Sequence, residues 1–270
     1  MRHTWRWFGK HDVVSLEDVE QAGASGIVTA LHHIENGSVW SVEEIQKRHD
    51  EISKRRNGDK TNLQWDVVES LPVSEEIKKQ DANWREHVSH YKQSLENLAQ
   101  CGLEVVCYNF MPILDWTRTE LSYSLSNGAT CMRFDYIDFA GFDIFILERT
   151  GAKEDYSLEI VEEAKRRVAE LSEAQKKQLA NNIVAGLPGA NQNLTMHDIK
   201  SLLETYSDID ESRLKQNLYA FLEEVIPTAE NLGIRMCCHP DDPPFSLLGL
   251  PRIMSTQEDY ASMVAAVDSP

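Results

Sequence analysis

Short apolar runs alternate with amphipathic helical patterns along the chain. The runs at 26–31, 63–69 and 103–109 have the length and the boundaries of buried strands. They begin about 40 residues apart, and a helical pattern that ends at a glycine separates each run from the next. A fourth run, 234–238, follows Gly233 directly. This alternation of strand and helix predicts an α/β fold with a parallel sheet of four strands.

The interval between the third and fourth runs is roughly 90 residues longer than the repeat. It includes a charged helical region over 157–185. Because an excursion from the carboxyl end of a strand lies where lids cover active sites, we expect one domain over 1–270 with a lid inserted at 111–210. A peripheral helical decoration is the alternative interpretation of the same segment.

Polar side chains follow each expected strand. The carboxyl ends of parallel strands meet at one edge of a sheet, where α/β proteins bind their ligands. Imidazole, carboxylate and amide groups that converge at such an edge suit a divalent metal and a polyhydroxylated ligand. The residues in these positions are His32, His33, Glu69, Asn109, Asp115, Arg118, His239, Asp241 and Asp242.

His239 is the first candidate for a metal ligand, because it ends the fourth run abruptly. The competing interpretation is that the prolines after it end a strand, while His239 and the aspartates cap a surface loop. Trp116 is either part of the core or a platform for a sugar ring. Cys237 and Cys238 are expected to be packing residues, since they lie inside the apolar run.

The acidic composition narrows the choice of partners. The chain has 27 Lys and Arg against 44 Asp and Glu, a net charge of −17. Such a surface repels phosphate backbones and anionic membranes, so we expect neither nucleic acid nor a membrane as a partner. No apolar run reaches the roughly 20 residues that span a bilayer, and five cysteines without a C-x-x-C pair fit a reducing compartment. These features predict a soluble, cytoplasmic protein.

Several common catalytic motifs are missing from the sequence. It contains no H-E-x-x-H, no P-loop and no G-x-G-x-x-G. The sequence therefore contains no motif that would indicate a metalloprotease or a nucleotide-binding protein.

Seven motifs lie along essentially the whole chain. They are TWRWFG at 4–9, GIVTALHHI at 26–34, VVES at 67–70, CYNFMPILDWTRT at 107–119, NIVAGLPGA at 182–190, HPDDPP at 239–244 and LGLPRI at 248–253. Together they strongly resemble the motifs of the D-mannonate dehydratase family of the hexuronate pathway. The NFMPxLDWTRT and HPDDPP motifs are long enough to make chance agreement negligible.

The resemblance implies a (β/α)8 TIM barrel of the xylose-isomerase-like kind. It also implies a hydro-lyase that removes water from D-mannonate to give 2-keto-3-deoxy-D-gluconate. The cofactor it implies is Mn²⁺ or Fe²⁺, held by two His, one Cys and one Asp. On this chain only His239 matches a metal ligand of the family, and the expected acid and base residues would lie beyond Pro270.

The remaining site residues are assigned to the substrate. We expect His33, Glu69, Asn109 and Arg118 to orient its hydroxyls and carboxylate. Asp115 and Trp116 are expected to line the lid side of the site, and Asp241 is also assigned to substrate binding.

Four strands with their helices make half of a barrel. We therefore expect an incomplete barrel, the amino-terminal part of the family's chain, which is inactive alone, binds metal weakly and self-associates through its open strand edges. One alternative is another metal-dependent sugar isomerase or epimerase on the same barrel. The other is a non-catalytic fragment that acts only by association.

Overall fold

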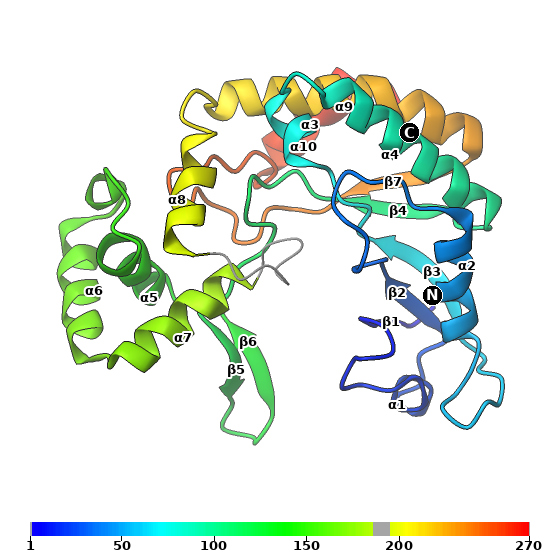
Figure 1. Cartoon of the computed structure of the whole chain (residues 1–270), viewed down its shortest axis with the longest axis horizontal. Coiled ribbons are helices and arrows are strands. Elements are labelled where there is room, and N and C mark those ends of the chain that lie inside the picture. Colours follow the sequence, from blue (N-terminus) through cyan, green and yellow to red (C-terminus); the bar gives the residue numbers. More distant parts are fainter. Residues whose placement is uncertain (1, 186–194, 270) are drawn as a thin grey trace. The chain divides into compact units, whose positions relative to one another are not determined.

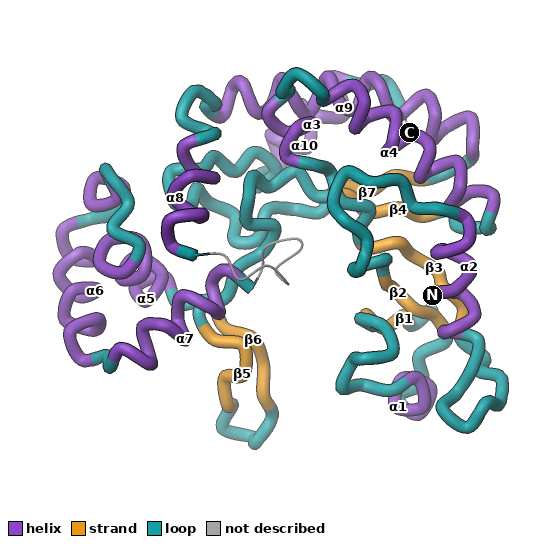
Figure 2. The backbone as a smooth tube through the Cα atoms, viewed as in Figure 1, coloured by secondary structure: helices purple, strands orange, loops and turns teal. Residues whose placement is uncertain are grey.

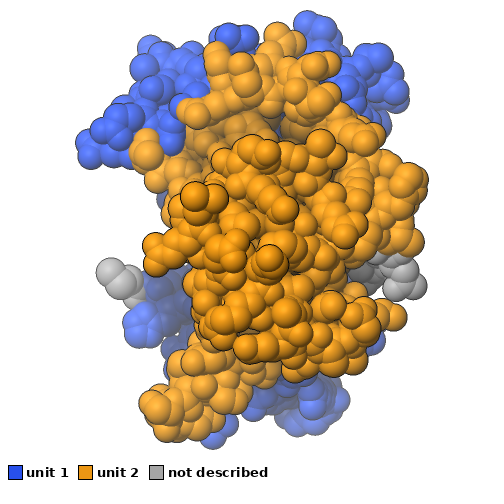
Figure 3. All heavy atoms as spheres, turned by 90° about the vertical axis from the view of Figure 1, so that its left-hand side faces the viewer, with its two compact units in different colours: residues 1–110, 215–239, 257–270 blue, residues 111–214, 240–256 orange. Residues whose placement is uncertain are grey.

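The computed structural model describes residues 2–185 and 195–269, which form two compact units, coloured separately in Figure 3. The first unit comprises residues 1–110, 215–239 and 257–270, and the second comprises residues 111–214 and 240–256. Residues 186–190 of the NIVAGLPGA motif lie outside the described residues. Within the described residues, no helix combines the length and the apolar character needed to cross a membrane.

A parallel sheet of five strands organises the first unit, in the order β1-β2-β3-β4-β7 (Figure 1). Strands β2, β3 and β4 are the first three expected strands, and β7, which pairs with β4, is the fourth. The strands are β1 (Thr4–Arg6), β2 (Gly26–Thr29), β3 (Gln64–Glu69), β4 (Val105–Tyr108) and β7 (Arg235–Cys238).

The expected count of four strands is wrong by one, because β1 was not predicted. This strand has only three residues, and none of them is fully buried. It therefore lacks the apolar run that marked the other strands. Its pairing with β2, in which Thr4 lies opposite Gly26, is what defines it.

Helices cover one face of this sheet. They are α1 (Leu16–Gln21), α2 (Val42–Ile52), α3 (Glu75–Lys79), α4 (Trp84–Gln100), α9 (Glu211–Leu232) and α10 (Gln257–Ala266). Side chains that alternate along a strand point to opposite faces, so Val106 and Tyr108 pack toward the helices. Phe221 of α9 contacts Tyr91 of α4 and Tyr108, at ring-centroid distances of 5.1 and 5.9 Å.

The second unit combines a hairpin with short helices. Figure 2 shows the antiparallel strands β5 (Glu120–Ser124) and β6 (Thr130–Arg133). The expected helical region over 157–185 is two helices, α6 (Leu158–Glu170) and α7 (Glu173–Val184). The other elements are α5 (Tyr136–Gly141), the π-helix η1 (Phe142–Ile146), the 3-10 helix η2 (Ala152–Asp155) and α8 (Met196–Glu204).

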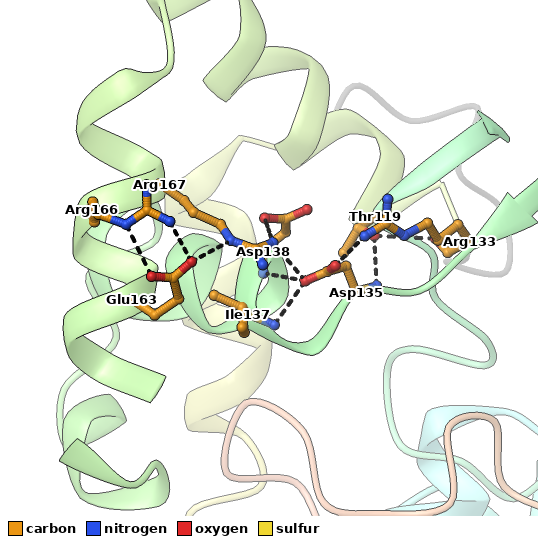
Figure 4. A network of polar contacts seen from close by, with 8 residues as sticks. All are labelled: Thr119, Arg133, Asp135, Ile137, Asp138, Glu163, Arg166 and Arg167. Atoms are coloured by element: carbon orange, nitrogen blue, oxygen red, sulfur yellow. Dashed lines mark hydrogen bonds and ion pairs between the residues drawn. The ribbon is translucent and has the colours of Figure 1, made fainter. Parts of the chain in front are cut away.

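A polar network holds the start of α5 against α6 (Figure 4). The carboxylate of Asp135 accepts hydrogen bonds from the backbone N–H groups of Ile137 and Asp138, both at 3.1 Å, and so caps α5. Arg167 of α6 donates to Asp135 at 3.1 Å and to Asp138 at 2.9 Å. Because Arg133 also pairs with Asp135, the end of the hairpin joins the same network.

Candidate active site at the carboxyl ends of the strands

The strand register places one carboxylate and two thiols in a row across neighbouring strands. Glu69 of β3 lies opposite Cys107 of β4, and Cys107 lies opposite Cys237 of β7. Asn109 and His239 come two positions after these cysteines, so the strand period directs them to the same face. This is the face opposite the helices, since Val106 and Tyr108 point the other way.

Glu69 is the centre of a charged group at this edge. Its Oε1 atom lies 2.6 Å from Nη1 of Arg6 and 3.9 Å from Nε2 of His239. The backbone N–H of His239 donates to the carbonyl of Tyr108 at 2.9 Å, which anchors the residue just after β7. Two predicted residues, Glu69 and His239, are thus brought together.

The sequence does not mark Arg6 as a site residue, because β1, the strand that it ends, has no apolar run. Arg6 ends β1, so it occupies the same kind of position as the polar residues that follow the other strands. The TWRWFG motif was its only signal in the sequence.

Asn109 lies beside the residue that follows Glu69. Its Nδ2 atom donates to Oγ of Ser70 at 3.4 Å. The amide is therefore placed near the Glu69 group, which is compatible with the predicted role in orienting hydroxyl groups.

The two neighbouring histidines have different surroundings. Both are exposed, but the Nε2 atom of His33 lies 2.8 Å from Oε2 of Glu44 at the start of α2. The His32 ring lies 5.5 Å from the Phe8 ring, and the Arg6 guanidinium lies 5.0 Å from the same Phe8 ring. Of the pair, His32 is therefore the one beside Arg6, and no signal in the sequence distinguished it from His33.

The protein packed around His32, together with the charges of Arg6, Arg48 and His33, lowers the pKa of His32 from 6.5 to about 4. The unfolded chain takes up a proton near pH 6.5 that the folded chain takes up only near pH 4. Stability contributed by neutral His32 is therefore lost as the pH falls between these values.

We expect His32→Gln to reduce the pH dependence of the free energy of unfolding between pH 6.5 and about 4. Because His32 is an exposed residue and solvent screens its charge, the effect is about 1 kcal/mol or less. Urea unfolding at a series of pH values from 7 to about 4 measures it. His11→Gln, at another exposed histidine, is the control and should follow the unchanged chain. Parallel curves for the His32 variant and the unchanged chain would contradict the assignment.

The second unit holds the other predicted site residues around Arg252. Arg118 donates to both carboxylate oxygens of Asp242, at 3.0 and 2.7 Å, and its guanidinium lies 5.7 Å from the Trp116 ring. Arg252 is 7% exposed. Burial lowers the pKa of Arg252, and the charges of Asp241, Asp115 and Asp242 oppose that shift.

Asp241 is held firmly by backbone and hydroxyl donors. Its Oδ2 atom accepts from the Met254 N–H at 2.6 Å and from Ser255 Oγ at 2.9 Å. Burial raises the pKa of this carboxyl, and these hydrogen bonds oppose the rise. Asp241 therefore joins the loop that carries HPDDPP to the loop that follows LGLPRI.

Neither group forms a complete metal site. Within residues 2–185 and 195–269, no three His, Cys, Asp or Glu side chains are placed to hold a metal ion. Glu69 and His239 supply one carboxylate and one imidazole, fewer ligands than a closed metal centre uses. The prediction that His239 binds metal stays a prediction.

The expectation that Cys237 is a packing residue is wrong. Cys237 is exposed, because it lies on the face of the sheet away from the helices and in an edge strand. Cys107 is 7% exposed. Its thiol keeps its proton because a hydrogen bond with Cys237 and burial both raise the pKa of Cys107.

Comparison with known proteins identifies the family. The sequence model of the D-mannonate dehydratase (UxuA) family matches residues 1–270. The chain is 53% identical to the mannonate dehydratase of Rhizobium meliloti over 270 residues, covering 100% of this chain and 66% of the relative. It is 52% identical to mannonate dehydratase 1 of Agrobacterium fabrum over 269 residues, covering 100% of this chain and 65% of the relative.

A solved structure agrees with this match. The crystal structure of the Streptococcus suis serotype 2 mannonate dehydratase aligns with a TM-score of 0.70 and 31% identity, over 100% of this chain and 62% of that one. The chain thus spans about two thirds of the length of the relatives it matches. With a family match over all 270 residues and an α/β fold shared with a member of known structure, the chain belongs to the D-mannonate dehydratase family.

Proposed function

We propose that this chain serves the dehydration of D-mannonate to 2-keto-3-deoxy-D-gluconate, in the catabolism of hexuronates. The observation that carries the proposal is the group of Arg6, Glu69 and His239 at the strand ends of a chain that matches the family throughout. The five parallel strands fit a (β/α)8 barrel, and residues 111–210 are proposed as its lid.

The reaction sets clear demands on such a site. A base removes the proton from C2, beside the substrate carboxylate, and an acid protonates the C3 hydroxyl as it leaves. The C2 proton is only weakly acidic. As it leaves, negative charge develops on the neighbouring carboxylate, and fixed positive charges or hydrogen-bond donors nearby must stabilise that charge. Arginines and amide groups held in fixed positions meet that demand.

The described residues are assigned to binding and orientation. Arg6 holds the Glu69 carboxylate, which leaves Glu69 fixed to accept from substrate hydroxyls. Asn109 and His33 are proposed to orient further hydroxyls. On the second unit, Arg118 is proposed to bind the substrate carboxylate. Asp115, Trp116 and Asp241 are proposed to line the substrate site.

The family suggests a divalent metal, which we propose to be Mn²⁺ or Fe²⁺ with His239 as one ligand. Because the described residues do not complete a ligand set, we assign no step of the reaction to the metal on this chain. We also propose that the chain self-associates through its open strand edges, where Trp5 is 41% exposed.

A chimera tests the proposed function. In the Rhizobium meliloti relative, the matching 66% of the chain is replaced by these 270 residues. We expect the chimera to form the 2-keto product from D-mannonate, whereas the 270-residue chain assayed alone with Mn²⁺ forms none at enzymatic rates. A folded chimera that forms no product, or that interconverts aldoses and ketoses instead, would refute the proposal.

Glu69→Gln in the chimera tests the role of the charged group. The neutral amide loses the ion pair with Arg6 and the attraction to His239. We expect kcat/KM for D-mannonate to fall by roughly a hundredfold, because misplaced positioning groups cost about that much. Glu104→Gln is the matched control, since Glu104 is exposed and lies 3.7 Å from Arg235. Equal activity of the two variants would remove Glu69 from the site.

A further inference from the structure

Cys107 and Cys237 face each other across two neighbouring strands. They are register partners in the parallel pairing of β4 with β7, so both thiols lie on the same face of the sheet. Neighbouring strands lie about 4.8 Å apart, and disulfides join Cα atoms separated by roughly 4.4 to 6.8 Å. The Cys237 thiol donates to the carbonyl of Val106 at 3.7 Å, which turns its sulfur toward β4.

The two thiols differ in their access to solvent. Cys237 is exposed in an edge strand, whereas Cys107 is buried in the strand beside it. Both are free thiols. An oxidant from solvent therefore reaches Cys237 first, and the Cys107 thiol lies next to it in the neighbouring strand.

The other two cysteines of the first unit are poorly placed to compete. Cys238 follows Cys237 directly, so it points to the opposite face, and its thiol donates to the carbonyl of His239 at 3.6 Å. Cys101 ends α4, before β4 begins.

We propose that Cys107 and Cys237 are an oxidation-sensitive pair that closes to a disulfide when a hydroperoxide reaches Cys237. The Cys237 sulfur attacks the peroxide, the O–O bond breaks, and a sulfenic acid and one water or alcohol are formed. The Cys107 sulfur then attacks the Cys237 sulfur, and the S–O bond breaks to release a second water. In sum, two thiols lose two electrons and two protons, and the peroxide accepts them.

The pair lies beside the charged group of the candidate site. Glu69 is in the same row of register partners, and His239 is two residues beyond Cys237. A disulfide fixes β7 against β4 and so limits the movement of the segment that carries His239. The modification is thus placed to change the geometry of His239 relative to Glu69.

Mass spectrometry of the intact 270-residue chain tests the proposal. The reduced chain is treated with hydrogen peroxide at about one equivalent and digested without reductant. We expect two of the five thiols to disappear, the mass to fall by two hydrogen atoms, and a cross-linked peptide to join Cys107 to Cys237. Dithiothreitol should restore both thiols.

Other products would overturn it. Oxygen atoms added to Cys237 while Cys107 stays a thiol would show that the pair does not close. A bond from Cys237 to Cys238, or a bond between two chains, would show that another thiol is the partner.

Two serine variants serve as matched controls. Cys131→Ser removes an exposed thiol of the hairpin and should leave closure unchanged. Cys237→Ser removes an exposed thiol of the pair, so Cys107 should then stay reduced under the same treatment. Loss of the Cys107 thiol in this variant would refute the proposal, and because Cys237 is exposed, the substitution should not unfold the sheet.

Discussion

Replacing Asp143 with asparagine is expected to destabilise the second unit by about 3 kcal/mol, because it removes the fully buried one of the two carboxylates that pair with Arg149. Asp143 is fully buried, and its two oxygens accept from Nε and Nη2 of Arg149 at 2.9 and 2.8 Å. Tyr156 also donates to this carboxylate at 2.9 Å. Asparagine keeps the size, but it turns one acceptor into a donor that faces other donors.

Asp155→Asn is the control for this prediction. Asp155 pairs with the same Arg149, but its side chain is 47% exposed, so the loss should be less than about 1 kcal/mol. Hydrogen exchange of α5 and α6, together with urea unfolding, measures both variants. If both variants lose a similar free energy of unfolding, the burial of the Asp143–Arg149 pair does not determine how much it stabilises the unit.

Phe221→Ala is expected to cost the first unit about 3 to 5 kcal/mol, the usual range for removing a buried phenylalanine. Phe221 is fully buried in α9, and its ring meets those of Tyr91, Tyr108 and Phe110 at 5.1, 5.9 and 5.9 Å. The truncation opens a cavity between two helices and the end of β4, which these rigid rings cannot fill by small shifts.

Phe8→Ala makes the same chemical change at the surface. Phe8 is 54% exposed, so the expected loss is about 1 kcal/mol or less. Thermal unfolding followed by circular dichroism compares the two. If Phe221→Ala costs no more than Phe8→Ala, the aromatic cluster does not hold α9 on the sheet.

Much of the sheet could be predicted from the sequence, because its strands carry apolar runs. The runs at 63–69, 103–109 and 234–238 correspond to β3, β4 and β7 within a residue or two. The hairpin was not predicted because most of its residues are exposed, including Cys131 and Met132. Without a buried face, a strand leaves no alternation of apolar and polar residues.

The candidate site could be predicted only in part. Glu69 and His239 follow recognisable strands, so their meeting at one edge is a consequence of parallel topology. Arg6 follows a strand without an apolar pattern, and Arg252 lies in a loop, where periodicity gives no information. Their positions depend on tertiary packing that the local sequence does not encode.

The pairing of β4 with β7 also constrains the order in which the chain folds. Cys237 of β7 and Val106 of β4, whose hydrogen bond links the two strands, are 131 positions apart, whereas β2 and β3 pair across about 40 residues. Closing the longer loop costs roughly 1 kcal/mol more in chain entropy. Strands β1 to β4 can associate while the ribosome is still adding α6 and α7, and β7 docks after them. His239 and Cys237 therefore reach Glu69 and Cys107 only after strands β1 to β4 have associated, so the Glu69–His239 pair of the candidate site forms later than the strands that support it.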